Sequence, residues 1–122
     1  MPADIVVVGE NPSLGENLAE FLAAYDFNVR LVRDMPEAES LRSKGQIARD
    51  AVLIDACSRR NCSAQRLWRA GPLNANPLVV VGPRGDGSSG ERLYHVALPL
   101  VASDVVRLLR ELLTAGPRNL ST

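Results

Sequence analysis

The sequence of 122 residues predicts a single α/β domain built on a doubly wound, five-stranded parallel sheet. Its main signal is the alternation of short apolar runs with amphipathic stretches, in the order β-α-β-α-β-α-β, a loop and β-α. Such alternation is typical of parallel sheets covered by helices on both faces. The run at 51–54 is continuously apolar, as expected of a strand buried on both faces. Right-handed crossovers then favour the strand order 2-1-3-4-5.

The first strand and helix are expected in residues 4–25. Residues 4–8 form the strand, and residues 9–12 form the turn after it. Ser13 and Glu16 fit the capping box S-x-x-E, which opens a helix. The apolar residues of this helix recur at helical spacing, so that one face packs on the sheet: Leu14, Leu18, Phe21, Leu22 and Tyr25.

The second strand is expected at 28–32, where polar and apolar residues alternate. Asp34 then caps the next helix, because its carboxylate can accept from the free N–H groups of the first turn. Pro36 and Glu37 suit that first turn. Gly45 marks the end of the helix.

The third strand, at 51–54, carries Asp55 at its carboxyl end. A third helix is expected at 63–70 and is stopped by a Gly-Pro pair, and a fourth strand follows at 78–81. In open α/β sheets, ligands and chemistry gather outside the carboxyl ends of the strands. Asp55 is therefore the first candidate for a functional residue.

The connection between the fourth and fifth strands is unusual. Residues 82–90 read as a loop because they are rich in Gly, Ser and Pro, so the fourth helix is expected to be shortened or replaced by a loop. The fifth strand is expected at 93–98, and Ser103 caps the last helix. The domain spans 1–115, and 116–122 is a linker or C-terminal tail.

Composition excludes several classes of protein. The chain has 14 basic and 14 acidic residues, whereas a nucleic-acid-binding domain usually carries a basic excess. Its apolar runs are too short to span a bilayer, and its first residues do not match a signal peptide, so we expect a cytoplasmic protein. Cys57 and Cys62 have no histidine or second cysteine pair nearby, which favours free thiols over a zinc site.

Arginines cluster after the third strand, at Arg59, Arg60, Arg66 and Arg69. One interpretation is an anion or nucleotide site at the switch point of the sheet. We favour the alternative of solvated arginines, one of which neutralises Asp55.

Two further features do not indicate an enzyme. The loop at 82–90 matches neither G-x-G-x-x-G nor a Walker A pattern, so a flexible connector is preferred to a phosphate cradle. His95 is the only histidine and has no nucleophile at a recognisable elbow, which gives no support to a hydrolase triad.

Four segments together resemble the receiver (CheY-like) family of response regulators over nearly the whole chain. They correspond to the first strand with its acidic turn, the third strand, the fourth strand, and the fifth strand with its proline: residues 6–12, 50–55, 77–82 and 97–100. The resemblance implies the flavodoxin-like fold. It also implies that Asp55 holds the phospho-acceptor position and that the peptide bond before Pro99 is cis.

The sequence departs from this family at three positions that carry its chemistry. The family has two adjacent acids that help to hold Mg²⁺, where this chain has Gly9 and Glu10. The family's hydroxyl after the fourth strand is replaced by Gly82, and its lysine before the proline by Leu98. Glu10 and Asp55 remain as an acidic remnant that could bind Mg²⁺ weakly, so no cofactor is expected.

These replacements matter because phosphoryl transfer depends on positioning and on stabilising charge at the transferring oxygens. The sequence thus predicts a non-enzymatic signalling module, a pseudo-receiver that acts through protein–protein interaction without phosphorylation. The alternative is an atypical receiver phosphorylated on Asp55 by a histidine kinase. Lesser alternatives are a small-ligand sensor and a pseudo-receiver of the type found in the cyanobacterial clock protein KaiA, which residues 79–97 resemble.

The expected working surface combines the fifth strand with the loop before it and the last helix. Tyrosine and arginine are residue types that often anchor interfaces. The candidate residues are Arg84, Tyr94, His95, Arg107 and Arg110. The expected partner is a protein of a signalling pathway, with a homodimer also compatible, and neither nucleic acid nor membrane is expected.

Overall fold

The computed structural model describes residues 3–56, 63–82, 93–97 and 102–115. All neighbouring strands are parallel, and the sheet order is β2-β1-β3-β4-β5, as the sequence predicts. The strands are β1 (Ala3–Val8), β2 (Val29–Val32), β3 (Ile47–Ala56), β4 (Leu78–Gly82) and β5 (Leu93–Ala97). The helices are α1 (Pro12–Ala23), α2 (Met35–Ser43), α3 (Ser63–Ala70), the 3-10 helix η1 (Pro72–Ala75) and α4 (Ala102–Ala115).

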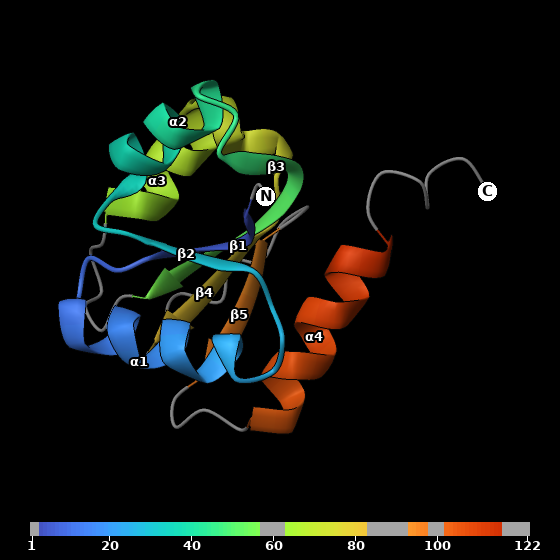
Figure 1. The fold of residues 1–122 in the computed structure, drawn as a ribbon. Coiled ribbons are helices and arrows are strands. Elements are labelled where there is room, and N and C mark those ends of the chain that lie inside the picture. The colour runs from blue at the N-terminus through green and yellow to red at the C-terminus, as the bar shows by residue number, and fades with distance from the viewer. Residues whose placement is uncertain (1–2, 57–62, 83–92, 98–101, 116–122) are drawn as a thin grey trace.

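The sheet is covered on both faces, with α2 and α3 on one side and α1 and α4 on the other (Figure 1). Each face has its own apolar core, because side chains alternate between the two faces along every strand. The first core joins strand residues to α2 and α3 and includes Val6, Leu53, Leu78, Met35 and Trp68. The second joins them to α1 and α4 and includes Ile5, Ile54, Val79, Leu18 and Leu109. Among the described residues, no helix is long and apolar enough to cross a membrane.

Helix α1 begins one residue before the predicted capping box. Its N-cap is Asn11, whose side-chain oxygen accepts from the backbone N–H of Leu14 at 3.2 Å, and Pro12 takes the first helical position. The expected cap at Ser13 is therefore wrong, because proline at the first turn suits a start at residue 12. The helix leads into Asp26, which adopts a positive φ of 69°.

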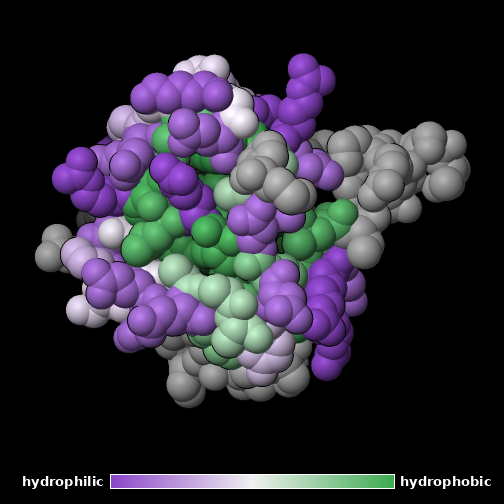
Figure 2. Space-filling model, viewed as in Figure 1, coloured by the Kyte–Doolittle hydropathy of each residue, from purple (hydrophilic) through white to green (hydrophobic). Residues whose placement is uncertain are grey.

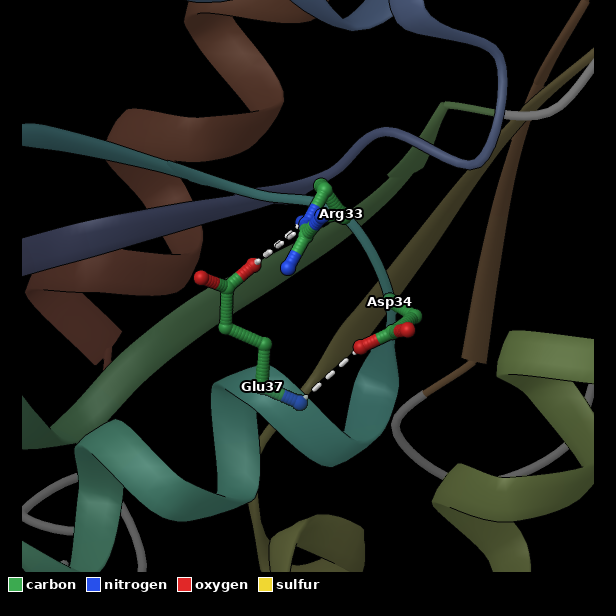
Figure 3. A network of polar contacts seen from close by, with 3 residues as sticks. All are labelled: Arg33, Asp34 and Glu37. Carbon is green, nitrogen blue, oxygen red and sulfur yellow. Dashed lines mark hydrogen bonds and ion pairs between the residues drawn. The ribbon is translucent and has the colours of Figure 1, made fainter.

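Helix α2 is capped as the sequence predicts (Figure 3). The backbone N–H of Glu37 donates to Asp34 Oδ1 at 3.0 Å. The Glu37 carboxylate reaches back and accepts from the backbone N–H of Arg33 at 2.7 Å, with the Arg33 Nε 3.9 Å away. The chain leaves the helix through Gly45, whose φ of 75° favours glycine.

Strand β3 is longer than the predicted 51–54, since it starts at Ile47 and continues past Asp55 to Ala56. Its pairing with β1 contains a large irregularity: while β1 advances from Ala3 to Ile5, β3 advances from Ile47 to Val52. The extra residues of β3 cannot all be paired by β1. Carbonyl groups in this bulge therefore need partners from elsewhere in the chain.

Asn76, just before β4, supplies those partners. Its Nδ2 donates to the carbonyl oxygens of Arg49 and Ala51, both at 2.8 Å. Its Oδ1 accepts from Arg42 Nη1 at 2.7 Å, and its backbone oxygen accepts from Trp68 Nε1 at 2.8 Å. The side chain is 1% exposed. This one residue thus joins α2, α3 and the bulge of β3.

Several predictions concern the carboxyl-terminal part of the chain. The third helix has the expected bounds, and β5 has the expected start. The expected cap at Ser103 is wrong, because α4 already includes Ala102. The predicted loop at 82–90 lies largely outside the described residues.

We expect Asn76→Ala to lower the free energy of unfolding by about 2 kcal/mol or more, because it leaves buried carbonyl groups and the Arg42 guanidinium without their partner. Urea denaturation measures the change. Asn74→Ala is the matched control, since Asn74 is exposed and its side chain makes one long hydrogen bond of 3.5 Å. Its effect should stay within about 0.5 kcal/mol. Equal effects of the two substitutions would contradict this role of Asn76.

Candidate functional site

The candidate site lies at the carboxyl edge of the sheet, where β1 and β3 are neighbours and the strand order reverses. Asp55 is the penultimate residue of β3 and pairs with Val8 of β1 on one side and Val80 of β4 on the other. The predicted position of Asp55 at the switch point is therefore confirmed, although the strand runs one residue further than expected.

The Asp55 carboxyl group is removed from water. The residue is 1% exposed, and no hydrogen-bond donor lies within reach of its Oδ1 in the described part of the chain. Burial, and secondly the charge of Glu10, raise the pKa of Asp55 to about 7. Both causes disfavour the ionised form. A substantial fraction of Asp55 is consequently protonated at neutral pH.

Glu10 follows β1 and is half-buried, and its charge acts on Asp55 across the switch point. Across the described residues, no three His, Cys, Asp or Glu side chains come together as a metal site would require. Mg²⁺ prefers ionised oxygen ligands in a near-octahedral arrangement. Two carboxyl groups, one of them with its pKa raised to about 7, are a poor match to that preference.

The position of the missing acid is closed by backbone packing. A Cβ atom on Gly9 would lie 3.2 Å from Gly15 Cα and 3.2 Å from Leu31 Cδ1. A Cβ atom on Gly15 would lie 2.9 Å from Gly9 Cα, a separation that real side chains do not adopt. The end of β1 therefore touches α1 directly. A carboxylate at position 9 would require α1 to move.

Gly15 is a site residue that the sequence analysis missed. A glycine inside a helix costs about 1 kcal/mol relative to alanine, so its presence at the first turns of α1 was the available signal. Asn11 contributes to the same arrangement, because its backbone N–H donates to the carbonyl of Ala56 at 3.3 Å. This bond ties the start of α1 to the end of β3, beside Asp55.

The remaining predicted residues are distributed over three places. Gly82 ends β4 and pairs with Ala97 at the same edge of the sheet as Asp55. Arg66 and Arg69 are exposed on α3, and no ion pair joins either of them to Asp55. Outside the described residues lie the positions for which the structure gives no account: Cys57, Arg59, Arg60, Cys62, Arg84, Leu98 and Pro99.

The expected working surface is only partly described. Tyr94 and His95 lie in β5, opposite Val79 and Val80. Tyr94 is half-buried and packs against the core beneath α1 and α4, so part of its ring remains available. Arg107 and Arg110 are exposed on α4, three residues apart, and therefore share a helix face.

The pKa of Asp55 predicts a pH-dependent stability. An unfolded aspartate has a pKa near 3.9, so between about pH 4 and about pH 7 the folded state binds the proton more tightly. The contribution of Asp55 to the free energy of unfolding is therefore fully present below about pH 4 and is lost as the pH rises through about 7. The loss is about 1.4 kcal/mol per pH unit and up to about 4 kcal/mol in total.

Urea denaturation of the wild type and Asp55→Asn across this range measures the effect. The advantage of Asp55→Asn over the wild type should grow with pH and become constant above about pH 8. Asp50→Asn is the control, because Asp50 lies in the same strand but is exposed, and it should follow the wild type. A pH-independent difference between the wild type and Asp55→Asn would contradict the raised pKa.

Comparisons with known proteins support the fold. No protein-family model matches the sequence, and no curated protein matches it. The crystal structure of a candidate response regulator from Chloroflexus aurantiacus J-10-fl superposes with a TM-score of 0.67 and 18% sequence identity, covering 93% of this chain and 99% of that chain. At this identity the likeness concerns the fold alone. The chain therefore has the receiver-like, flavodoxin-like fold that the sequence predicts, with Asp55 buried at the switch point.

Proposed function

We propose that this chain is a non-enzymatic signalling module, a pseudo-receiver that binds a protein partner without being phosphorylated. The receiver-like fold supports a signalling module of this type. The state of Asp55 is the observation that carries the rest of the proposal: its carboxyl group is buried, its Oδ1 has no partner among the described residues, and its pKa is raised to about 7.

This state of Asp55 opposes phosphoryl transfer for two reasons. A carboxyl group attacks phosphorus as the anion, and burial disfavours that anion here. The transferring oxygens also need cationic or hydrogen-bonding groups around them. Gly9, Gly82 and Leu98 stand where the family provides an acid, a hydroxyl and an ammonium group, and a side chain at position 9 would press on Gly15 and Leu31.

One observation favours a second candidate function. Asp55 lies at the switch point next to Glu10, which is where a conventional phospho-acceptor would lie. An atypical receiver would use these two residues to hold Mg²⁺ weakly and would accept a phosphoryl group from a histidine kinase. The two candidates differ in whether Asp55 forms an acyl phosphate.

We expect no acyl phosphate after incubation with Mg²⁺ and acetyl phosphate, so the intact mass of the wild type should stay unchanged. NMR with Mg²⁺ and beryllofluoride, a phosphoryl mimic, should likewise leave the amides near Asp55 unshifted. Asp55→Asn is the control for any signal at other residues. A stoichiometric phosphate adduct that disappears in Asp55→Asn would establish the second candidate instead.

The proposal places partner binding on the surface of β5 and α4. Tyr94→Ala should keep the fold and weaken partner binding by about 2 kcal/mol, because a part-exposed tyrosine is a common anchor of an interface. Asp55→Asn should weaken it far less. A partner recovered by cross-linking in cells allows the affinity of each variant to be measured. Circular dichroism checks that each variant keeps the fold.

Tyr25→Ala is the matched control, since Tyr25 is the other tyrosine of the chain, follows α1 and is 41% exposed. It should leave affinity unchanged. If Asp55→Asn abolishes signalling in cells while Tyr94→Ala is silent, the chain is a conventional receiver.

A further inference from the structure

Strand β2 forms an open edge of the sheet with unpaired backbone groups. The carbonyl of Asn28 accepts from the N–H groups of Asp4 at 3.0 Å and Ile5 at 3.1 Å, and that of Val32 accepts from Gly9 at 2.8 Å. Alternate residues of a strand direct their backbone groups to the same edge, so those of Val29 and Leu31 point away from β1. In the described part of the chain no group bonds to them.

The side chains around this edge are apolar at its centre. Leu31 is 40% exposed and Val29 is half-buried. Figure 2, drawn from the side on which β2 crosses in front of the other strands, shows hydrophobic residues gathered at the middle of the face and hydrophilic ones around them. The Leu31 side chain packs over the Gly9–Gly15 contact, which holds it in place. An exposed apolar residue on an open edge is a site for strand pairing.

The ends of β2 restrict what can pair with it. The strand has four residues, and the next outward N–H, that of Arg33, is already bound by Glu37 (Figure 3). A long foreign strand would leave most of its own backbone groups without partners on this edge. A second copy of β2 has the same short length, and a two-fold axis at Leu31 would pair the open N–H and carbonyl of this residue with those of its copy. Val29 then faces Arg33, whose N–H is bound to Glu37 and whose carbonyl can accept from the N–H of Val29.

Charge favours one antiparallel register. With Leu31 opposite its own copy, Arg30 lies opposite Val32 of the second copy and diagonal to both its Asp34 and its Arg30. The two-fold axis makes the attractive contact between Arg30 and Asp34 twice and the repulsive contact between the two Arg30 side chains once. The neighbouring register, centred on Arg30, would place two arginines directly opposite each other, which is unfavourable.

We infer that β2 pairs antiparallel with β2 of a second copy of this chain, in the register centred on Leu31, and joins the two sheets into one. This dimer does not depend on whether Asp55 accepts phosphate, so it can fail while the proposed function holds, and the reverse. It uses the edge of the sheet opposite to β5 and leaves the proposed partner surface free.

A cysteine at the centre of the register tests the pairing directly. Residues in a hydrogen-bonded antiparallel pair have Cα atoms about 5.5 Å apart, which lies within the range of disulfides. In a chain carrying Cys57→Ser and Cys62→Ser, Leu31→Cys should form a disulfide-linked dimer of twice 13.2 kDa under mild oxidation. Leu67→Cys is the matched control, because Leu67 is 37% exposed on α3, and it should stay monomeric.

Light scattering after size-exclusion chromatography tests the same inference without a cross-link. The wild type and Leu67→Arg should have the mass of a dimer, twice 13.2 kDa. Leu31→Arg should have the mass of a monomer, 13.2 kDa. Three outcomes overturn the inference: a monomeric wild type, a dimer that survives Leu31→Arg, or cross-linking of Leu31→Cys no faster than that of Leu67→Cys.

Discussion

The central strands of this sheet have to be buried on both faces, and the rest of the molecule is arranged around that requirement. From Ala51 to Ala56 every residue of β3 is buried, and α2 and α3 cover one face while α1 and α4 cover the other. Among the described residues, only two polar or ionisable residues are buried, Asp55 and Asn76. A carboxylate in such a layer loses hydration that the surrounding apolar strands cannot replace. The chemistry of the candidate site follows from this loss.

The contact between Gly9 and Gly15 links the site to the rest of the fold. It lets β1 approach α1 closely, next to the bond from Asn11 to the end of β3, and it crowds the position of a second carboxylate beside Asp55. The same two glycines form the surface on which Leu31 of the edge strand rests. A substitution at either glycine would therefore disturb the acidic site and the open edge together.

The two edges of the sheet have different characters. At β5, Tyr94 is half-buried beside α4, which carries exposed arginines, and this polar and aromatic surface suits a protein partner. At β2, open backbone groups flank an exposed leucine, and the capping of α2 by Asp34 and Glu37 closes the edge beyond Val32. The proposed partner surface and the inferred dimer would use different edges of the sheet, so the two interactions would not compete for the same residues.

The sequence by itself determined the sheet order, the place of Asp55 and the cap at Asp34, because each is encoded by a short local pattern. Apolar runs and the spacing of helical residues are local, and right-handed crossovers leave few topologies for them. Only the tertiary structure decided the length of β3, the role of Asn76 and the closure of position 9 by Gly15. Asn76 bonds to Ala51 and Arg42, 25 and 34 residues away, and no periodic pattern marks such contacts. The lack of a hydrogen-bond partner for Asp55 Oδ1 among the described residues is likewise a property of packing, which no local pattern marks.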